Sequence, residues 1–188
     1  MEALWISTGI VALAEIGDKT QLLAIVLAAR FRKPLPIIAG IFVATLLNHA
    51  AAAGLGYIIA QWLSGDIFRI AVGVSFIAMA AWALIPDKED DRAEHMNAGG
   101  IFVTTLVAFF LVEIGDKTQI ATSLLAARYQ EIALVTMGTT LGMMLANVPA
   151  VVLGEAVTKI VPLSYVRVSA AFVFLLIGLW VVGDTLLR

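Results

Sequence analysis

The chain has 188 residues, of which 61% are apolar and only 14% are charged, and its formal net charge is −2. Mean hydropathy is +0.99, which excludes a soluble domain of this size. Apolar stretches of roughly 18 residues or more, each enough to cross a hydrocarbon core of about 30 Å as a helix, recur along the chain. Cysteine is absent, so disulfides and thiolate metal sites are excluded. The composition predicts an integral membrane protein whose ligands are oxygen and nitrogen atoms, and it gives no sign of a nucleic-acid partner.

Six membrane-spanning helices are predicted in chain order, with short connections that leave no room for an extramembrane catalytic domain. They lie at residues 3–29, 35–62, 67–85, 99–127, 132–157 and 164–187. The longest polar stretch, residues 86–100, is rich in acidic side chains. A run of charges of this kind is typical of a solvated linker, so we interpret it as an acidic loop between two halves.

The chain also contains an internal repeat. The heptamer from Glu15 to Gln21 recurs letter for letter from Glu113 to Gln119, and the match extends along both halves, as with Gly40 and Gly138. The repeat predicts three parts: a first three-helix repeat at 1–85, a linker at 86–100 and a second three-helix repeat at 101–188. Because three spans are an odd number, the second copy would enter the membrane from the opposite side. We therefore predict an all-α membrane protein whose six transmembrane helices form two inverted three-helix repeats, the plan of many secondary transporters.

Basic residues indicate the orientation. With Lys19 and Lys117 set aside, seven lie on the side of the first, third and fifth connections and three on the other side. The two sets are Arg30, Arg32, Lys33, Lys88, Arg92, Lys159 and Arg167 against Arg69, Arg128 and Arg188. Since basic loops stay in the cytoplasm, this bias predicts a cytoplasmic central loop and both termini outside.

The repeated heptamer carries the predicted site. Ionised side chains at membrane depth are costly and usually functional. If the inverted halves face one another, four carboxylates converge near the middle of the membrane: Glu15, Asp18, Glu113 and Asp116. Gly17 lowers helix propensity beside them, so local unwinding of the span is plausible. The predicted neutral donors are Thr20, Gln21, Thr118 and Gln119 in the heptamers and Asn48 and Asn147 on the second span of each half.

The charges of the two heptamers suggest a ligand. Four ionised carboxylates and the ammonium groups of Lys19 and Lys117 leave two negative charges, the charge of one divalent cation. Without a metal, some carboxylates would take up protons, because a charged site is unfavourable in a low dielectric. Metal and protons would then compete, which is the physical basis of cation/proton exchange. The two lysines would modulate this competition, and His49 is interpreted either as a hydrogen-bonded packing residue or as a proton relay or ligand.

A ridge of small residues marks the second span of each half. Small or short side chains recur every four residues in both copies: Gly40, Ala44, Asn48, Ala52 and Gly56 in the first, and Gly138, Gly142, Ala146, Ala150 and Gly154 in the second. Such ridges let helix backbones approach closely in a bilayer. We expect them to pack against the spans that carry the heptamers.

The doubled Glu-x-Gly-Asp-Lys-Thr signature, at Glu15 to Thr20 and Glu113 to Thr118, resembles a family of small cation transporters. That family includes bacterial manganese exporters of the MneA type and manganese and calcium transporters of Golgi and chloroplast membranes. The resemblance covers nearly the whole chain. It implies export of Mn²⁺ across a bacterial inner membrane, in exchange for protons, with the four motif carboxylates as ion-binding groups.

The residues by themselves leave alternatives open. Hard oxygen ligands suit Mg²⁺, Ca²⁺ or Mn²⁺, and an amide or imidazole ligand would favour Mn²⁺ somewhat over Ca²⁺; a Ca²⁺/proton antiporter remains an alternative. A passive divalent cation channel and an intramembrane hydrolase with paired acids are two others. Two equivalent half-sites fit transport better than hydrolysis. No cofactor is predicted, because the divalent cation is the substrate.

Overall fold

The structure is a computed structural model that describes residues 1–63, 65–85, 100–153 and 163–187. Within these ranges the chain is helical throughout, apart from short turns. Its helices are α1 (Glu2–Glu15), α2 (Lys19–Phe31), α3 (Pro34–Trp62), α4 (Asp66–Ala83), α5 (Ile101–Glu113), α6 (Lys117–Tyr129), α7 (Ile132–Leu153) and α9 (Leu163–Leu186). The all-α prediction is thus confirmed for the described residues. The predicted acidic linker lies outside them, except for Gly100.

Four helices are long and apolar enough to cross a membrane: α3, α4, α7 and residues 168–186 of α9. They match the predicted spans at 35–62, 67–85, 132–157 and 164–187. The spans predicted at 3–29 and 99–127 are not single helices, in keeping with the local unwinding expected at the heptamer glycines. Each of these segments is divided at its heptamer into two helices of 13 or 14 residues, α1 with α2 and α5 with α6.

Glycine backbone conformation explains both breaks. Gly17 has a φ of 81° and Gly115 a φ of 77°, in the left-handed region that side chains with a Cβ avoid. Each glycine is followed by an aspartate with extended backbone, Asp18 or Asp116, which occupies the N-cap position of the next helix. Aspartate is among the preferred N-cap residues. Gly-Asp in the heptamer therefore ends one helix and starts another.

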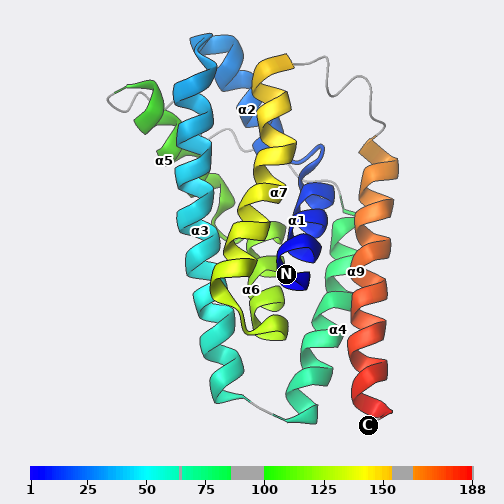
Figure 1. The fold of residues 1–188 in the computed structure, drawn as a ribbon. Helices are drawn as coiled ribbons and strands as arrows, with labels where there is room; N and C mark the ends of the chain where they lie inside the picture. Colours follow the sequence, from blue (N-terminus) through cyan, green and yellow to red (C-terminus); the bar gives the residue numbers. More distant parts are fainter. Residues whose placement is uncertain (64, 86–99, 154–162, 188) are drawn as a thin grey trace.

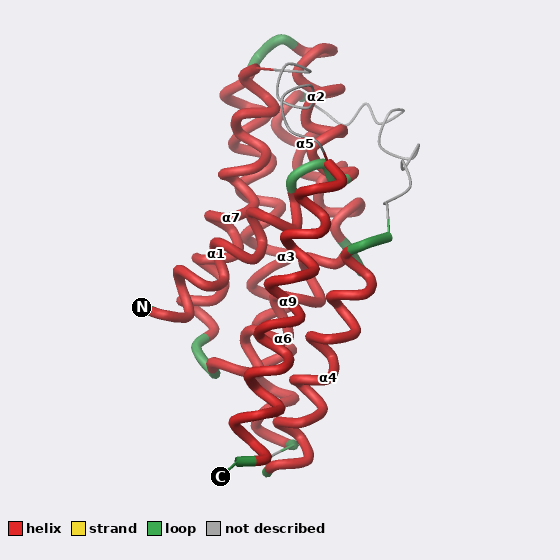
Figure 2. The backbone as a smooth tube through the Cα atoms, turned by 90° about the vertical axis from the view of Figure 1, so that its right-hand side faces the viewer, coloured by secondary structure: helices red, strands yellow, loops and turns green. Residues whose placement is uncertain are grey.

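Helices of one half pack against helices of the other. The helix α3 lies against α5 and α6, α7 lies against α1 and α2, and α4 pairs with α9. In Figure 1, α3 and α7 run in opposite directions along the long axis of the molecule. Figure 2, turned by 90°, shows α1 strongly inclined to that axis. The heptamers are thereby held between the two long central helices.

The described glycines of both ridges lie where the sequence predicts, whereas Gly154 lies outside the described residues. A Cβ added at Gly142 of α7 would come within 2.5 Å of the Thr8 carbonyl of α1, and one at Gly56 of α3 would overlap the Ser123 carbonyl of α6. A Cβ at Gly40 would meet Thr105 of α5 at 2.8 Å. Both ridges therefore pack against the helices that carry the heptamer of the other half, as expected of small residues at helix crossings in membranes.

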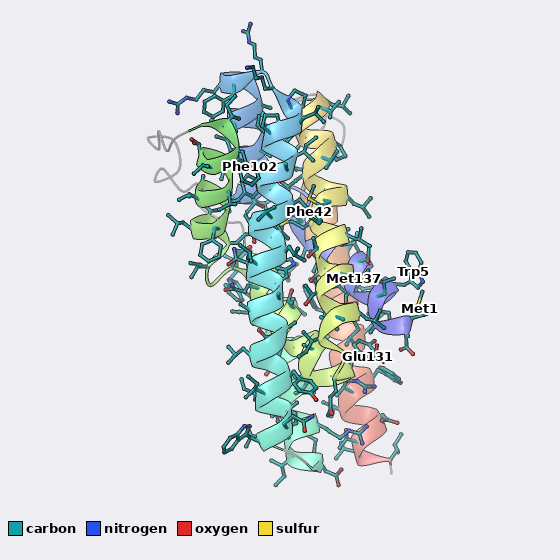
Figure 3. All side chains as sticks on the ribbon, turned by 60° about the vertical axis from the view of Figure 1, so that its left-hand side comes forward. Met1, Trp5, Phe42, Phe102, Glu131 and Met137 are labelled. Atoms are coloured by element: carbon teal, nitrogen blue, oxygen red, sulfur yellow. The ribbon has the colours of Figure 1, made fainter. Side chains whose placement is uncertain are left out.

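The outer surface is apolar. Phe42 on α3, Met137 on α7 and Trp5 on α1 project away from the bundle (Figure 3), and Trp5 is 65% exposed. Exposed apolar side chains over the length of α3, α7 and α9 fit a surface that faces lipid rather than water.

Candidate metal centre

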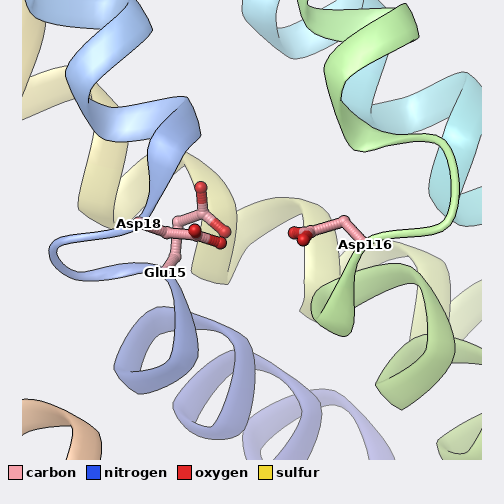
Figure 4. A group of neighbouring side chains, drawn as sticks. All are labelled: Glu15, Asp18 and Asp116. Carbon is pink, nitrogen blue, oxygen red and sulfur yellow. The ribbon is translucent and has the colours of Figure 1, made fainter. Parts of the chain in front are cut away.

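Three carboxylates from the two heptamers meet in the interior. Glu15 ends α1, while Asp18 and Asp116 stand at the starts of α2 and α6. Each offers one oxygen within 4.8 Å of the oxygens of the other two, and their exposed fractions are 0%, 2% and 3%. Figure 4 shows Glu15 and Asp18 pointing across the gap toward Asp116. We call these three residues the carboxylate cluster.

The glutamines of the heptamers hold the turns that position the cluster. The Gly17 backbone N–H donates to Oε1 of Gln21 at 2.8 Å, and the Gly115 N–H donates to Oε1 of Gln119 at 2.7 Å. Gln21 also donates through Nε2 to the Ala146 carbonyl of α7 at 3.1 Å. Both turns lie directly before the N-terminal ends of α2 and α6, where the helix dipole favours negative charge.

The two motif lysines occupy different surroundings. Nζ of Lys19 lies 3.3 Å from Oδ1 of Asp116, so the first heptamer supplies a cation to a carboxylate of the second. Lys117 donates to the Ile85 carbonyl at 2.8 Å and lies over the Trp82 ring at 5.9 Å from its centroid. Lys117 also lines a small cavity of about 30 Å³ that Asp18 lines as well.

Glu113 does not belong to the cluster. Its side chain is fully buried, and it accepts a hydrogen bond from Thr45 at 2.9 Å and one from Asn48 at 3.1 Å. Asn48 also donates to the Phe110 carbonyl. The structure thus brings together three of the four predicted carboxylates. The fourth, Glu113 at the end of α5, is hydrogen bonded to α3 instead. Sequence reasoning missed Thr45, although its position three residues before Asn48 places both on one face of α3.

Several buried polar atoms lack a hydrogen bond, among them one on Glu15 and one on its partner Asn147. Nδ2 of Asn147 donates to Oε1 of Glu15 at 3.4 Å and to the Met143 carbonyl at 3.1 Å, but Oδ1 of Asn147 has no donor. Within the described residues, Oε2 of Glu15, Oγ1 of Thr20 and both ring nitrogens of His49 also make no hydrogen bond. Buried polar groups are nearly always satisfied, so unsatisfied oxygens on Glu15 of the carboxylate cluster and on its partner Asn147 indicate a place for a ligand.

The remaining predicted donor, Thr118, donates from Oγ1 to Oδ2 of Asp116 at 3.2 Å. It therefore orients a cluster carboxylate. A site of three carboxylates with amide and hydroxyl oxygens close by suits a hard divalent cation, since such cations prefer oxygen ligands and carry the opposite charge. The geometry can bind a cation or, in its place, protons.

Similarity to known proteins agrees with this chemistry. A family model described as "Divalent cation/proton antiporter GDT1" matches residues 3–91 and 101–187, and so covers both repeats. A Vibrio cholerae protein named "Putative manganese exporter" is 55% identical over 180 residues, which cover 95% of this chain and 90% of that protein. GDT1-like protein 3 of Oryza sativa subsp. indica is 26% identical over 200 residues, covering 93% of this chain and 71% of that protein. GDT1-like protein 3 of Arabidopsis thaliana is 26% identical over 201 residues, with 93% and 68% covered. No solved structure matches the chain.

The family match spans nearly all of the sequence, and with the four candidate spans it identifies a multi-pass membrane transporter. It confirms the resemblance that the doubled motif indicated and sets aside the intramembrane hydrolase. The chain belongs to the GDT1 family of divalent cation/proton antiporters.

Proposed function

We propose that this protein exports Mn²⁺ from the bacterial cytoplasm in exchange for protons, and that the ion binds at the carboxylate cluster. The observation that carries the proposal is the meeting of Glu15, Asp18 and Asp116, with oxygens within 4.8 Å of one another in the buried centre of the bundle. The choice of manganese is supported by the name of the Vibrio cholerae relative. The choice of exchange rests on the family description.

The ligands of the proposed site come from both halves of the chain. The three cluster carboxylates would bind the ion directly, and Oδ1 of Asn147 and Oγ1 of Thr20, which lack a hydrogen bond, are available as neutral donors. Amide and hydroxyl oxygens are hard donors of the kind that Mn²⁺ accepts. Gln21, Gln119 and Thr118 would support the site indirectly, because their side chains hold the turns and orient Asp116.

Glu113 would join the site in another step of the cycle. In this conformation Thr45 and Asn48 bind both of its oxygens. Since the two heptamers are identical, we infer that Glu113 exchanges these hydrogen bonds for the ion when the site opens to the opposite side. His49, buried on α3 beside Asn48, would then modulate the polarity of the pathway.

Proton exchange follows from the charge of the cluster. Three carboxylates packed within 4.8 Å repel one another, and Lys19 offsets one charge at Asp116. A divalent cation relieves that repulsion, and so do protons when the cation leaves. One site that holds either the metal or protons, but not both, couples the two fluxes in opposite directions.

The proposed topology has six spans. Helices α1 and α2 would form one discontinuous span and α5 and α6 another, each broken at the ion site, as in transporters where half-helix ends face the substrate. The opposite directions of α3 and α7 support inverted repeats. From the bias of lysine and arginine we infer that the connection between α2 and α3 lies in the cytoplasm and both termini lie outside.

Transport into proteoliposomes tests the function. Purified protein would be assayed for uptake of Mn²⁺, Ca²⁺, Mg²⁺ and Zn²⁺ with and without an imposed pH gradient, with internal pH recorded. We expect Mn²⁺ uptake to be driven by the gradient and to move protons the other way. Divalent current that reverses at the cation equilibrium potential without proton movement would instead identify a channel. Preference for Ca²⁺ with intact proton coupling would identify a Ca²⁺/proton antiporter.

A further inference from the structure

Many hydroxyl groups in the described helices make the same local hydrogen bond. Thr8, Ser75, Thr105, Thr122, Thr139 and Thr185 each donate to the carbonyl four residues earlier, at 2.7–2.9 Å. This bond satisfies a hydroxyl group where water is scarce. Four buried hydroxyl groups make no hydrogen bond within the described residues: those of Ser7 on α1, Thr20 on α2, and Thr136 and Thr140 on α7. Thr136 and Thr140, which are 6% and 2% exposed, are the pair that lies on one helix.

These two threonines share one face of α7 with Asn147. At 3.6 residues per turn, positions 136, 140 and 147 fall within about 40° of one another around the helix axis. Thr140 lies about 6 Å along the axis from Thr136 and about 10 Å from Asn147. Asn147 contacts Glu15 of the carboxylate cluster and keeps its own Oδ1 without a hydrogen bond. Unsatisfied oxygen atoms therefore extend from the cluster toward Ile132, where α7 begins.

The internal repeat provides a comparison within the same molecule. The residues at the matching positions of the first half are Ile38 for Thr136 and Phe42 for Thr140. Phe42 projects outward from α3 (Figure 3) and is 44% exposed. The buried hydroxyls are thus present in one half only, and packing common to both copies does not explain them.

We propose that Thr136, Thr140 and Asn147 line the route by which the divalent cation passes between the carboxylate cluster and the membrane side on which α7 begins. An ion that leaves water needs oxygen atoms in place of its hydration shell at successive points of its path. The three side chains offer such oxygens in sequence, and none is committed to the protein. In the proposed orientation this side is the outside, so the route is the exit of an exporter. The inference rests on the proposed function.

Replacement of single hydroxyls tests the route. Thr140→Val keeps the shape of the side chain and removes the oxygen, and it is expected to slow Mn²⁺ flux roughly tenfold, as for loss of one hydrogen-bonding contact to a charged group. Thr140→Ser keeps the oxygen and should retain most of the flux. Thr139→Val is the matched control, because Thr139 is equally buried on the same helix but donates to the Val135 carbonyl. Its flux should equal that of the wild type.

Thiol labelling adds a readout that does not depend on rate. Because the chain has no cysteine, the variants Thr140→Cys and Thr139→Cys each carry a single thiol. A membrane-impermeant thiol reagent should modify Thr140→Cys from the side on which α7 begins, more slowly when Mn²⁺ is present, and should leave Thr139→Cys unmodified.

The outcomes separate the route from the function. If the wild type transports Mn²⁺ while Thr140→Val retains full flux and Thr140→Cys stays unmodified from both sides, the route is overturned and the proposed function stands. Modification from the opposite side alone would also overturn it. If the wild type moves no divalent cation, the proposed function fails, and the route fails with it.

Discussion

Lys19, the first residue of α2, reaches across the interface between the two heptamers and places its Nζ 3.3 Å from Oδ1 of Asp116, the residue that precedes α6. Asp116 is 3% exposed, so the pair lies largely out of water. The ammonium group offsets negative charge within the carboxylate cluster. At the proposed site, Lys19 would therefore set how strongly protons compete with the metal.

We expect Lys19→Ala to shift the pH dependence of transport upward. Without the ammonium group the cluster is more negative and holds protons to a higher pH, so Mn²⁺ flux should reach half of its maximum at a higher pH than in the wild type. The measurement is the initial rate of Mn²⁺ uptake against pH. Lys33→Ala, at an exposed position before α3, is the control and should leave the profile unchanged. An unshifted profile for Lys19→Ala would argue against metal and protons sharing the cluster.

The two glutamates of the repeat should respond differently to the same substitution. Glu15 lies in the cluster, whereas Glu113 is hydrogen bonded to Thr45 and Asn48. Loss of a partner outside the ligand shell costs roughly 10- to 100-fold in metal affinity, and loss of a ligand should cost at least as much. We therefore expect Glu15→Gln to weaken Mn²⁺ binding by about 100-fold or more. Glu113→Gln should weaken binding far less while still reducing transport.

Calorimetric titration of Mn²⁺ into detergent-solubilised protein measures both affinities, with thermal unfolding as a check that each variant is folded. Equal losses of affinity in the two variants would show that Glu113 is a ligand in the resting state. Intact affinity in Glu15→Gln would remove the cluster as the metal site.

The repeat explains how much of this arrangement the sequence could predict. Identical heptamers and four-residue ridges of small side chains are visible in one sequence, so the meeting of the motifs between packed halves followed from them. Gly17 indicates a break in the first span. The left-handed conformation of this glycine, however, depends on Asp18 capping the next helix and on Gln21 binding the glycine N–H. These local bonds give the turn its shape, and hydropathy averaged over a span does not register them.

The unequal roles of Glu15 and Glu113 could not be predicted from identical heptamers. These roles depend on which side chains the second span of the opposite half places near each glutamate. At matching positions α3 carries Thr45 and Asn48, whereas α7 carries Met143 and Ala146. Two donors are available to Glu113 and none to Glu15 at these positions, so the side chains around the motif break the symmetry.

Close helix packing predicts opposite effects for two glycines of α3. A Cβ at Gly56 would overlap the Ser123 backbone of α6, while a Cβ at Gly54 would meet nothing within 4 Å. Gly56→Ala should lower the free energy of unfolding by about 1–3 kcal/mol, the usual cost of overpacking. Gly54→Ala should be neutral or slightly stabilising, because alanine favours a helix more than glycine does. Thermal unfolding in detergent compares them, and an unchanged midpoint for Gly56→Ala would contradict the observed approach of α3 and α6.

The turn before α6 offers a test of how backbone conformation positions a ligand. Gly115 has a φ of 77°, and a Cβ there would meet nothing within 4 Å, so any effect of Gly115→Ala comes from strain rather than from collision. Holding a residue with a Cβ in this region costs about 1–3 kcal/mol. The turn would relax and move the adjacent Asp116, so we expect weaker Mn²⁺ binding together with lower stability.

Gly115→Asn should recover part of both losses, since asparagine tolerates left-handed backbone better than alanine. Gly9→Ala, in the middle of α1 with open space around it, controls for the added methyl group and should bind Mn²⁺ as the wild type does. If Gly115→Ala bound Mn²⁺ normally, the left-handed turn would not be what holds Asp116 in the cluster.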